Sequence, residues 1–135
     1  MISRFFYILL FSIIMPSPVK FDVEIDRKDI VKGEYIHLTI DVDIEKGFFI
    51  YSTDSDKSLS PTKIIWPDST LFTDSSFFFE PVPKVKYDNN FEMDVSYHTD
   101  KVQFDQYFVT SKEIDDLDQV SGKLFYQACD VKQCL

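Results

Sequence analysis

The sequence predicts an all-β domain built as an antiparallel sandwich. Apolar and polar residues alternate over several short stretches, which is the period of two expected for half-buried strands. No stretch shows a sustained helical period, and turn residues recur at short intervals between the alternating stretches. Strands that follow one another without helices are typical of two packed antiparallel sheets. A chain of 135 residues is long enough for one such domain with its own core and too short for two.

The first half of the chain contains three predicted strands. Apolar residues alternate with charged ones over residues 21–25, and a longer alternation covers residues 36–44. The pair at 32–33, Lys-Gly, predicts a turn between them. A second Lys-Gly pair, at 46–47, ends the second strand before an aromatic strand over residues 48–52.

Four later runs have the same signature, each short and bounded by Pro, Asp, Asn, Ser or Gly. These runs cover residues 64–66, 91–97, 102–108 and 124–128. The polar stretch over residues 52–60 predicts an exposed loop. The number and spacing of the strands predict an immunoglobulin-like β-sandwich.

The N-terminal residues 1–17 have the features of a secretory signal. Arg4 supplies a basic start, and residues 5–15 form an apolar run interrupted only by Ser12. This run is shorter than the roughly 20 apolar residues that a membrane-spanning helix needs. We therefore expect a signal peptide over residues 1–17, followed by one exported domain over residues 18–135.

The net charge of −9 limits the kinds of partner. Nucleic acids and anionic membrane surfaces are negatively charged, so they are poor partners for this chain. Export also matters for the cysteines, because disulfides persist in oxidising compartments outside the cytosol.

The chain contains two cysteines, Cys129 and Cys134, and we expect them to form a disulfide with each other. Their Cα atoms must then approach to roughly 4.4–6.8 Å, so the segment must fold back as a turn. A loop this short contributes only about 2 kcal/mol to stability, which makes it a weak staple. A close pair does suit exchange chemistry, in which one thiolate attacks and the second resolves the mixed disulfide. The alternative is a structural disulfide on a surface turn.

A metal site is a poor alternative for the cysteines. Zinc usually takes four protein ligands, or three and a water molecule, and the chain adds only His37 and His98. We expect both histidines to lie on the surface, and we expect no metal and no cofactor.

The segment F-Y-Q-A-C-D-V-K-Q-C-L, residues 125–135, resembles the cysteine motif of the N-terminal periplasmic domain of the thiol:disulfide interchange protein DsbD family. Three further matches follow the expected order: K-G-F-F-I-Y-S at 46–52, P-T-K-I-I-W-P at 61–67 and F-F-F-E-P-V-P-K-V-K-Y at 77–87. Together they span most of the chain after its first twenty residues. Family members continue with a Pro-rich step, a final strand, membrane helices and a thioredoxin-like domain, so we expect this chain to be truncated at its C-terminus.

The resemblance implies a function as well as the same fold. It implies a protein-disulfide reductase domain in the periplasm that takes electrons from a membrane-embedded domain of the same protein. These electrons would pass to periplasmic thiol-disulfide oxidoreductases. Cys134 would form the mixed disulfides, and Cys129 would resolve them. The rival interpretation is a non-enzymatic immunoglobulin-like binding domain with a structural disulfide.

Phe77, Phe78 and Phe79 form an aromatic run whose members cannot all face one side of a strand. By position the run matches a family loop that caps the cysteines, so the resemblance implies that one of these rings shields the disulfide. The alternative is an edge strand with one exposed ring.

The resemblance also implies aromatic surroundings for the cysteines. The residues concerned are Phe49, Tyr51, Tyr87 and Tyr126. Core packing is the alternative role, most of all for Phe49, whereas a tyrosine can present an apolar ring and keep its hydroxyl in water. Asp130 adjoins Cys129, and its negative charge is expected to disfavour a thiolate there.

Overall fold

A computed structural model describes residues 16–27, 29–66, 76–111, 113 and 121–135. Apart from one short 3-10 helix, every regular element in these residues is a strand. The elements are β1 (Val19–Ile25), β2 (Tyr35–Ile44), β3 (Phe49–Tyr51), η1 (Lys57–Leu59), β4 (Lys63–Ile65), β5 (Phe77–Phe79), β6 (Lys84–Asp88), β7 (Met93–His98), β8 (Lys101–Val109), β9 (Lys123–Phe125) and β10 (Ala128–Cys129). No helix among them is long and apolar enough to cross a membrane.

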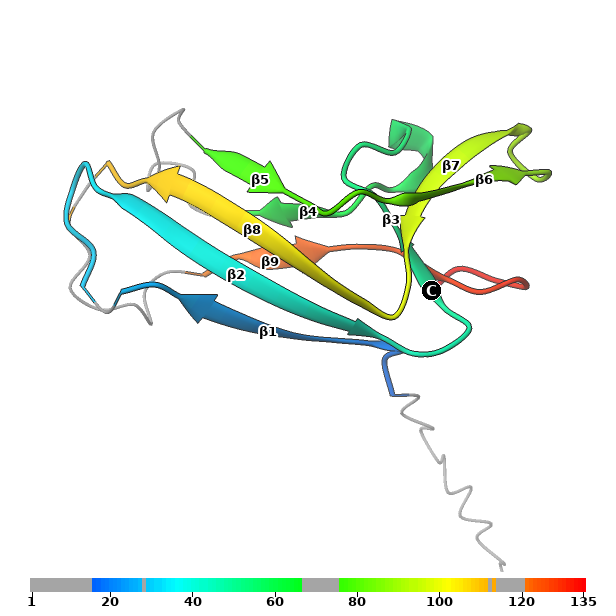
Figure 1. The fold of residues 1–135 in the computed structure, drawn as a ribbon, viewed down its shortest axis with the longest axis horizontal. Coiled ribbons are helices and arrows are strands. Elements are labelled where there is room, and N and C mark those ends of the chain that lie inside the picture. The colour runs from blue at the N-terminus through cyan, green and yellow to red at the C-terminus, as the bar shows by residue number, and fades with distance from the viewer. Residues whose placement is uncertain (1–15, 28, 67–75, 112, 114–120) are drawn as a thin grey trace, which may run out of the picture.

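Two four-stranded antiparallel sheets form the domain, and a two-stranded ribbon accompanies them (Figure 1). The first sheet has the order β1-β2-β8-β5, and the second has the order β10-β3-β7-β6. The ribbon pairs β4 with β9. Figure 1 shows β2 and β8 crossing the length of the molecule side by side. The predicted all-β, sandwich-like architecture is confirmed.

The core lies between the two sheets and is supplied mainly by the long strands. In β2, every second residue from Ile36 to Ile44 is buried, as the alternation in the sequence predicts. Phe104 of β8 lies opposite Ile40 and is fully buried. The second sheet contributes Ile50 and Ala128 to the same cluster. Full burial of one such side chain is worth about 1.5–3 kcal/mol, so this cluster dominates the stability of the fold.

Two predicted turns contain a glycine in a conformation that other residues rarely adopt. Gly33 and Gly47 have φ angles of 84° and 94°, and glycine populates this region without a steric penalty. In the second turn the amide of Phe48 donates to the carbonyl of Glu45 at 3.0 Å. The chain therefore reverses where the sequence predicts, between β2 and β3.

Several boundaries differ from the sequence prediction. The run over residues 124–128 is divided between β9 and β10, and β7 begins at Met93. The strand β6 was not predicted, because it is an edge strand whose Val85 and Tyr87 remain exposed. The stretch over residues 52–60 is not uniformly exposed, since Leu59 of η1 is buried.

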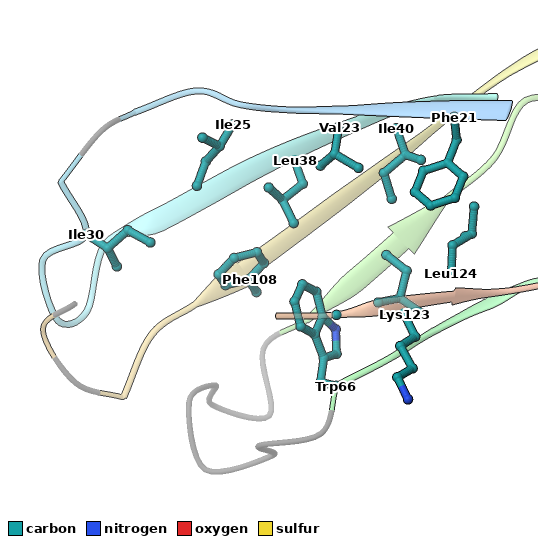
Figure 2. Close-up of a pocket in the computed structure, with 12 residues that line it drawn as sticks. Phe21, Val23, Ile25, Ile30, Leu38, Ile40, Trp66, Phe108, Lys123 and Leu124 are labelled. Carbon is teal, nitrogen blue, oxygen red and sulfur yellow. The ribbon is translucent and has the colours of Figure 1, made fainter. Parts of the chain in front are cut away.

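An apolar pocket of about 220 Å³ opens between the first sheet and the β4–β9 ribbon (Figure 2). Phe21 and Val23 of β1 point into it, Phe108 of β8 lines it from the same sheet, and Trp66 lies across from them beside the ribbon. Because they face this opening, Phe21 and Val23 are 46% and 52% exposed, more than their alternation alone predicts.

Candidate functional site

A tight turn at the end of the chain joins the two cysteines. Cys129 and Cys134 form a disulfide, and their Cα atoms lie 4.0 Å apart, slightly closer than the expected range. The amide of Leu135 donates to the carbonyl of Ala128 at 2.7 Å, which holds the two sides of the turn together. The predicted pairing and the predicted reversal of the chain are both present in the structure.

Asp130 organises this turn. Its carboxylate accepts hydrogen bonds from the amides of Lys132 at 2.7 Å and Gln133 at 2.8 Å. These backbone hydrogen bonds lower the pKa of Asp130 below its ordinary value, and the one from Lys132 has the largest effect. The side chain therefore has a structural role, and the two amides partly offset its charge beside Cys129.

The two cysteines differ sharply in access to solvent. Cys129 is 1% exposed, whereas Cys134 is an exposed residue. Cys129 belongs to β10 and lies opposite Phe49 of β3, while Cys134 lies on the returning side of the turn. A partner can therefore approach the sulfur of Cys134 far more easily than that of Cys129.

The side chain of Cys129 faces away from the sandwich core. Its neighbour Ala128 packs into that core, and successive side chains of a strand point to opposite faces. On the outer face of the second sheet Cys129 belongs to a buried cluster, which we call the cysteine cluster. Its members are Phe49, Tyr51, Leu59, Val95 and Cys129, with Met93 and Tyr97 packed against them.

The aromatic rings of the cysteine cluster make edge-on contacts. The ring of Phe49 lies 5.5 Å from the ring of Tyr51 and 5.5 Å from that of Tyr97. Burial, and then the charge of Asp88, raise the pKa of Tyr51. The structure thus brings two of the sequence-predicted surroundings, Phe49 and Tyr51, together with the buried cysteine.

The sequence alone did not point to several residues of this site. Leu59 lies in a polar stretch, and Tyr97 lies in a predicted strand that carried no functional signal. Lys86 belongs to β6, and its ammonium group lies 3.8 Å from the ring centroid of Phe49. The alternation K-V-K-Y at 84–87 could have indicated both the strand and the shared face of its lysines.

The family model for the N-terminal domain of the thiol:disulfide interchange protein DsbD matches residues 13–135. This chain belongs to the DsbD N-terminal family. The match covers all but the first twelve residues, and it confirms the resemblance seen in the cysteine motif. No curated protein and no solved structure gives a significant match.

The aromatic run of this DsbD-type domain lies away from the cysteine cluster. Phe77, Phe78 and Phe79 form β5, the edge strand of the first sheet beside β8. Phe78 stacks on Phe104 of the core at 5.2 Å, whereas Phe77 and Phe79 are 52% and 54% exposed. The three rings therefore alternate between the two faces of the strand, as three consecutive residues must. Among the described residues, none of the three phenylalanines belongs to the cysteine cluster or packs against it. The role of the run as a cap stays a prediction.

The two other predicted tyrosines also lie outside the cysteine cluster of the DsbD-type domain. Tyr87 is 60% exposed on the edge strand β6. Tyr126 packs against the sandwich core, and its hydroxyl lies 3.4 Å from that of Ser17.

The prediction of two surface histidines is wrong for His98. This residue lies opposite Ile50 on the inner face of the second sheet and is 5% exposed. Its Nε2 atom is 2.8 Å from Oε2 of Glu80, which also accepts a hydrogen bond from the amide of Thr53 at 3.0 Å, and the hydroxyl of Ser52 donates to Oε1 of the same carboxylate. Burial alone would raise the pKa of Glu80. The hydrogen bonds, of which the one with His98 has the largest effect, outweigh burial and lower the pKa to about 2.

His37 is half-buried and is held by its neighbours on the outer face of the first sheet. Its ring stacks on that of Tyr107 at 4.4 Å, and its Nε2 atom lies 2.7 Å from a carboxylate oxygen of Asp105. Neither histidine contacts a cysteine, and no group of three or more metal-ligating side chains occurs in the residues that the structure describes.

Proposed function

We propose that this domain exchanges electrons with partner proteins through the Cys129–Cys134 disulfide. The observation that carries the proposal is the unequal exposure of the two cysteines, one buried and one exposed, across a bridge that closes a very short turn. Membership of the DsbD N-terminal family supports the same conclusion.

Reduction of the domain begins at the exposed sulfur. A donor thiolate attacks the Sγ atom of Cys134, a new S–S bond forms, and the bond to Cys129 breaks with its electron pair remaining on Cys129. The second thiol of the donor then attacks the mixed disulfide. The donor leaves oxidised, and the domain keeps two electrons and two protons as a pair of thiols.

Oxidation of the domain uses the same sulfur in reverse. The Cys134 thiolate attacks the disulfide of an acceptor and forms a mixed disulfide with one of its cysteines. Cys129 then attacks the Sγ atom of Cys134 and restores the internal bridge. The acceptor leaves with two thiols, so two electrons have passed through the domain.

The fold suits repeated opening of this bridge. A loop of this length adds only about 2 kcal/mol to stability, so its reduction leaves most of the folding free energy in place. The hydrogen bonds of Asp130 hold the turn independently of the sulfur atoms. Cys129 stays anchored by the pairing of β10 with β3.

The expected location and partners follow from the family. The signal-like residues 1–17 and the family support a periplasmic domain of a larger protein. The electron donors would be the membrane-embedded and thioredoxin-like domains of that protein, and the acceptors would be periplasmic thiol-disulfide oxidoreductases.

Single-cysteine variants test the proposal. Cys129→Ser leaves only the exposed thiol, and Cys134→Ser leaves only the buried one. At equal pH, Cys129→Ser should react with Ellman's reagent at least about tenfold faster, because exchange depends on access. Equal rates in the two folded variants, or a faster Cys134→Ser, would show that Cys134 is not the attacking residue.

A further inference from the structure

Opening the disulfide at Cys134 places a negative charge on a buried sulfur. Cys129 is 1% exposed, and its neighbours Phe49, Leu59 and Val95 are apolar. A thiolate in such surroundings is disfavoured unless a positive charge lies nearby. The proposed exchange therefore requires something that stabilises this leaving group.

The charged and titratable groups around Cys129 come from every element that packs against the cysteine cluster. They are Tyr51 of β3, Tyr97 of β7, Lys84, Lys86 and Asp88 of β6, Asp56 and Lys57 beside Leu59, and Asp130 and Lys132 of the turn. Asp56 and Lys57 are exposed, and Lys132 is exposed at the tip of the turn. Lys86 is half-buried, which distinguishes it from the exposed Lys57, Lys84 and Lys132.

Lys86 lies on the same face of the second sheet as Cys129. It is paired with Val95, which belongs to the cysteine cluster. Its ammonium group is 3.8 Å from the ring centroid of Phe49 and 4.6 Å from that of Tyr97. Both contacts are cation–π interactions, which hold an ammonium group over a ring face.

Phe49 connects this cation to the cysteine. It lies directly opposite Cys129 in the β3–β10 pair, and such residues have Cβ atoms about 5 Å apart. The ring of Phe49 therefore contacts the ammonium group and lies beside the cysteine, so the charge is on the order of 8 Å from the sulfur. No carboxylate forms an ion pair with Lys86 in the part of the chain that the structure describes.

We infer that Lys86 is a positioning residue that stabilises the Cys129 thiolate during disulfide exchange. Its ammonium group is held by its contacts with the rings of Phe49 and Tyr97. The inference rests on the proposed function and deepens it. The ammonium group of Lys86 would then supply the positive charge that the buried Cys129 thiolate requires. This charge would oppose the negative charge of Asp130, which disfavours the thiolate.

The pKa of Cys129 in the reduced chain gives the direct test. NMR of cysteine labelled at Cβ can follow each thiol separately in the parent chain and in Lys86→Met. Removal of the charge should raise the pKa of Cys129 by about half to one unit, as expected for a charge at this distance in a partly screened site. Lys86→Arg should keep the parent value, since it keeps the charge and its contact with the rings.

Lys84→Met is the matched control. Lys84 lies two residues away on the same strand and face, but its ammonium group donates to the hydroxyl of Thr99 at 2.5 Å. Loss of this charge should leave the pKa of Cys129 within about 0.2 units, given screening at the surface. Lys86→Gln provides a second neutral variant in case methionine disturbs the packing.

The kinetic result should follow the pKa. A disulfide opens more slowly when the leaving thiol has a higher pKa, so reduction of Lys86→Met by a small thiol should be about two- to fourfold slower than in the parent. An unchanged pKa in both neutral Lys86 variants, or an equal rise in Lys84→Met, overturns the inference. The pKa measurement needs no partner, so a parent chain that failed to exchange would refute the proposed function and leave the role of Lys86 to this test.

Discussion

Cys129 and Phe49 lie directly opposite each other in the antiparallel pair of β10 and β3, on the face of the sheet that points away from the sandwich core. Because of this pairing, the disulfide and the core residues of the same two strands lie on opposite faces of the second sheet. Ile50 and Ala128, one position along each strand, belong to the core. The side chains around the disulfide can therefore change without disruption of the packing between the sheets.

Replacement of Phe49 should affect the disulfide more than the fold. Phe49→Leu shortens a side chain that is 9% exposed and should cost about 1–1.5 kcal/mol, as a conservative core substitution does. It should also remove the ring contact that holds the ammonium group of Lys86 near Cys129, so reduction by a small thiol should be slower. Phe78→Leu is the matched control, since Phe78 stacks on Phe104 at 5.2 Å in the core. If the two variants are reduced at the same rate, Phe49 does not assist the departure of the Cys129 thiolate.

Removal of both cysteines should leave the sandwich folded. The variant Cys129→Ser with Cys134→Ser loses a loop-closure contribution of about 2 kcal/mol, and the hydrogen bonds of Asp130 still hold the turn. Urea unfolding followed by circular dichroism should show one cooperative transition at a slightly lower midpoint. Loss of that transition would identify the bridge as structural, and the main argument for exchange would no longer hold.

The sequence predicts the sandwich well where one face of a strand is buried. The alternation in β2 matches its burial residue by residue, because a period of two places every second side chain in the core. It fails for β6, because the alternation K-V-K-Y at 84–87 is short and its apolar members, Val85 and Tyr87, lie exposed on an edge strand. It also fails for His98, whose burial depends on Glu80, a residue from a distant part of the chain.

One part of the candidate site could likewise be predicted from the sequence, and the other part could not. The cysteine turn could be predicted because all of its residues are adjacent in the sequence. Lys86 and Tyr97 could not, because their contacts with Phe49 arise only from the pairing of β7 with β3 and β6. A spatial cluster assembled from separate strands leaves no local pattern in a single sequence.

The aromatic run offers a test of the predicted cap. Alanine replacement of Phe77, Phe78 and Phe79, one at a time, should show one position whose loss speeds reduction of the disulfide by a small thiol. Phe78→Ala should also lower stability by about 2–4 kcal/mol, because this ring packs against the core. Circular dichroism checks that each variant is folded. If no folded variant reacts faster than the parent, the run is an ordinary edge strand.

The Glu80–His98 contact should make stability depend on acid pH. The pKa of Glu80 falls from 4.5 to about 2 in the folded domain, so the unfolded chain binds a proton on this residue more readily than the folded chain. This contribution to stability is therefore fully present above pH 4.5 and is lost as the pH falls through the window between 4.5 and about 2. Glu80 is 11% exposed at its side chain, and Glu80→Gln should lower stability at neutral pH by about 2 kcal/mol through the loss of charged hydrogen bonds.

The pH dependence separates Glu80 from the other carboxylates. Urea unfolding at a series of pH values should show a steep loss of stability in the parent between pH 4.5 and about 2, and a shallower one in Glu80→Gln. Glu24→Gln is the control, since Glu24 is exposed on β1 and should leave the slope unchanged. Parallel curves for the parent and Glu80→Gln would show that the carboxylate is not held in its charged form by His98, Ser52 and Thr53. In that case the buried network would stabilise the crossing from β5 to β6 by packing alone.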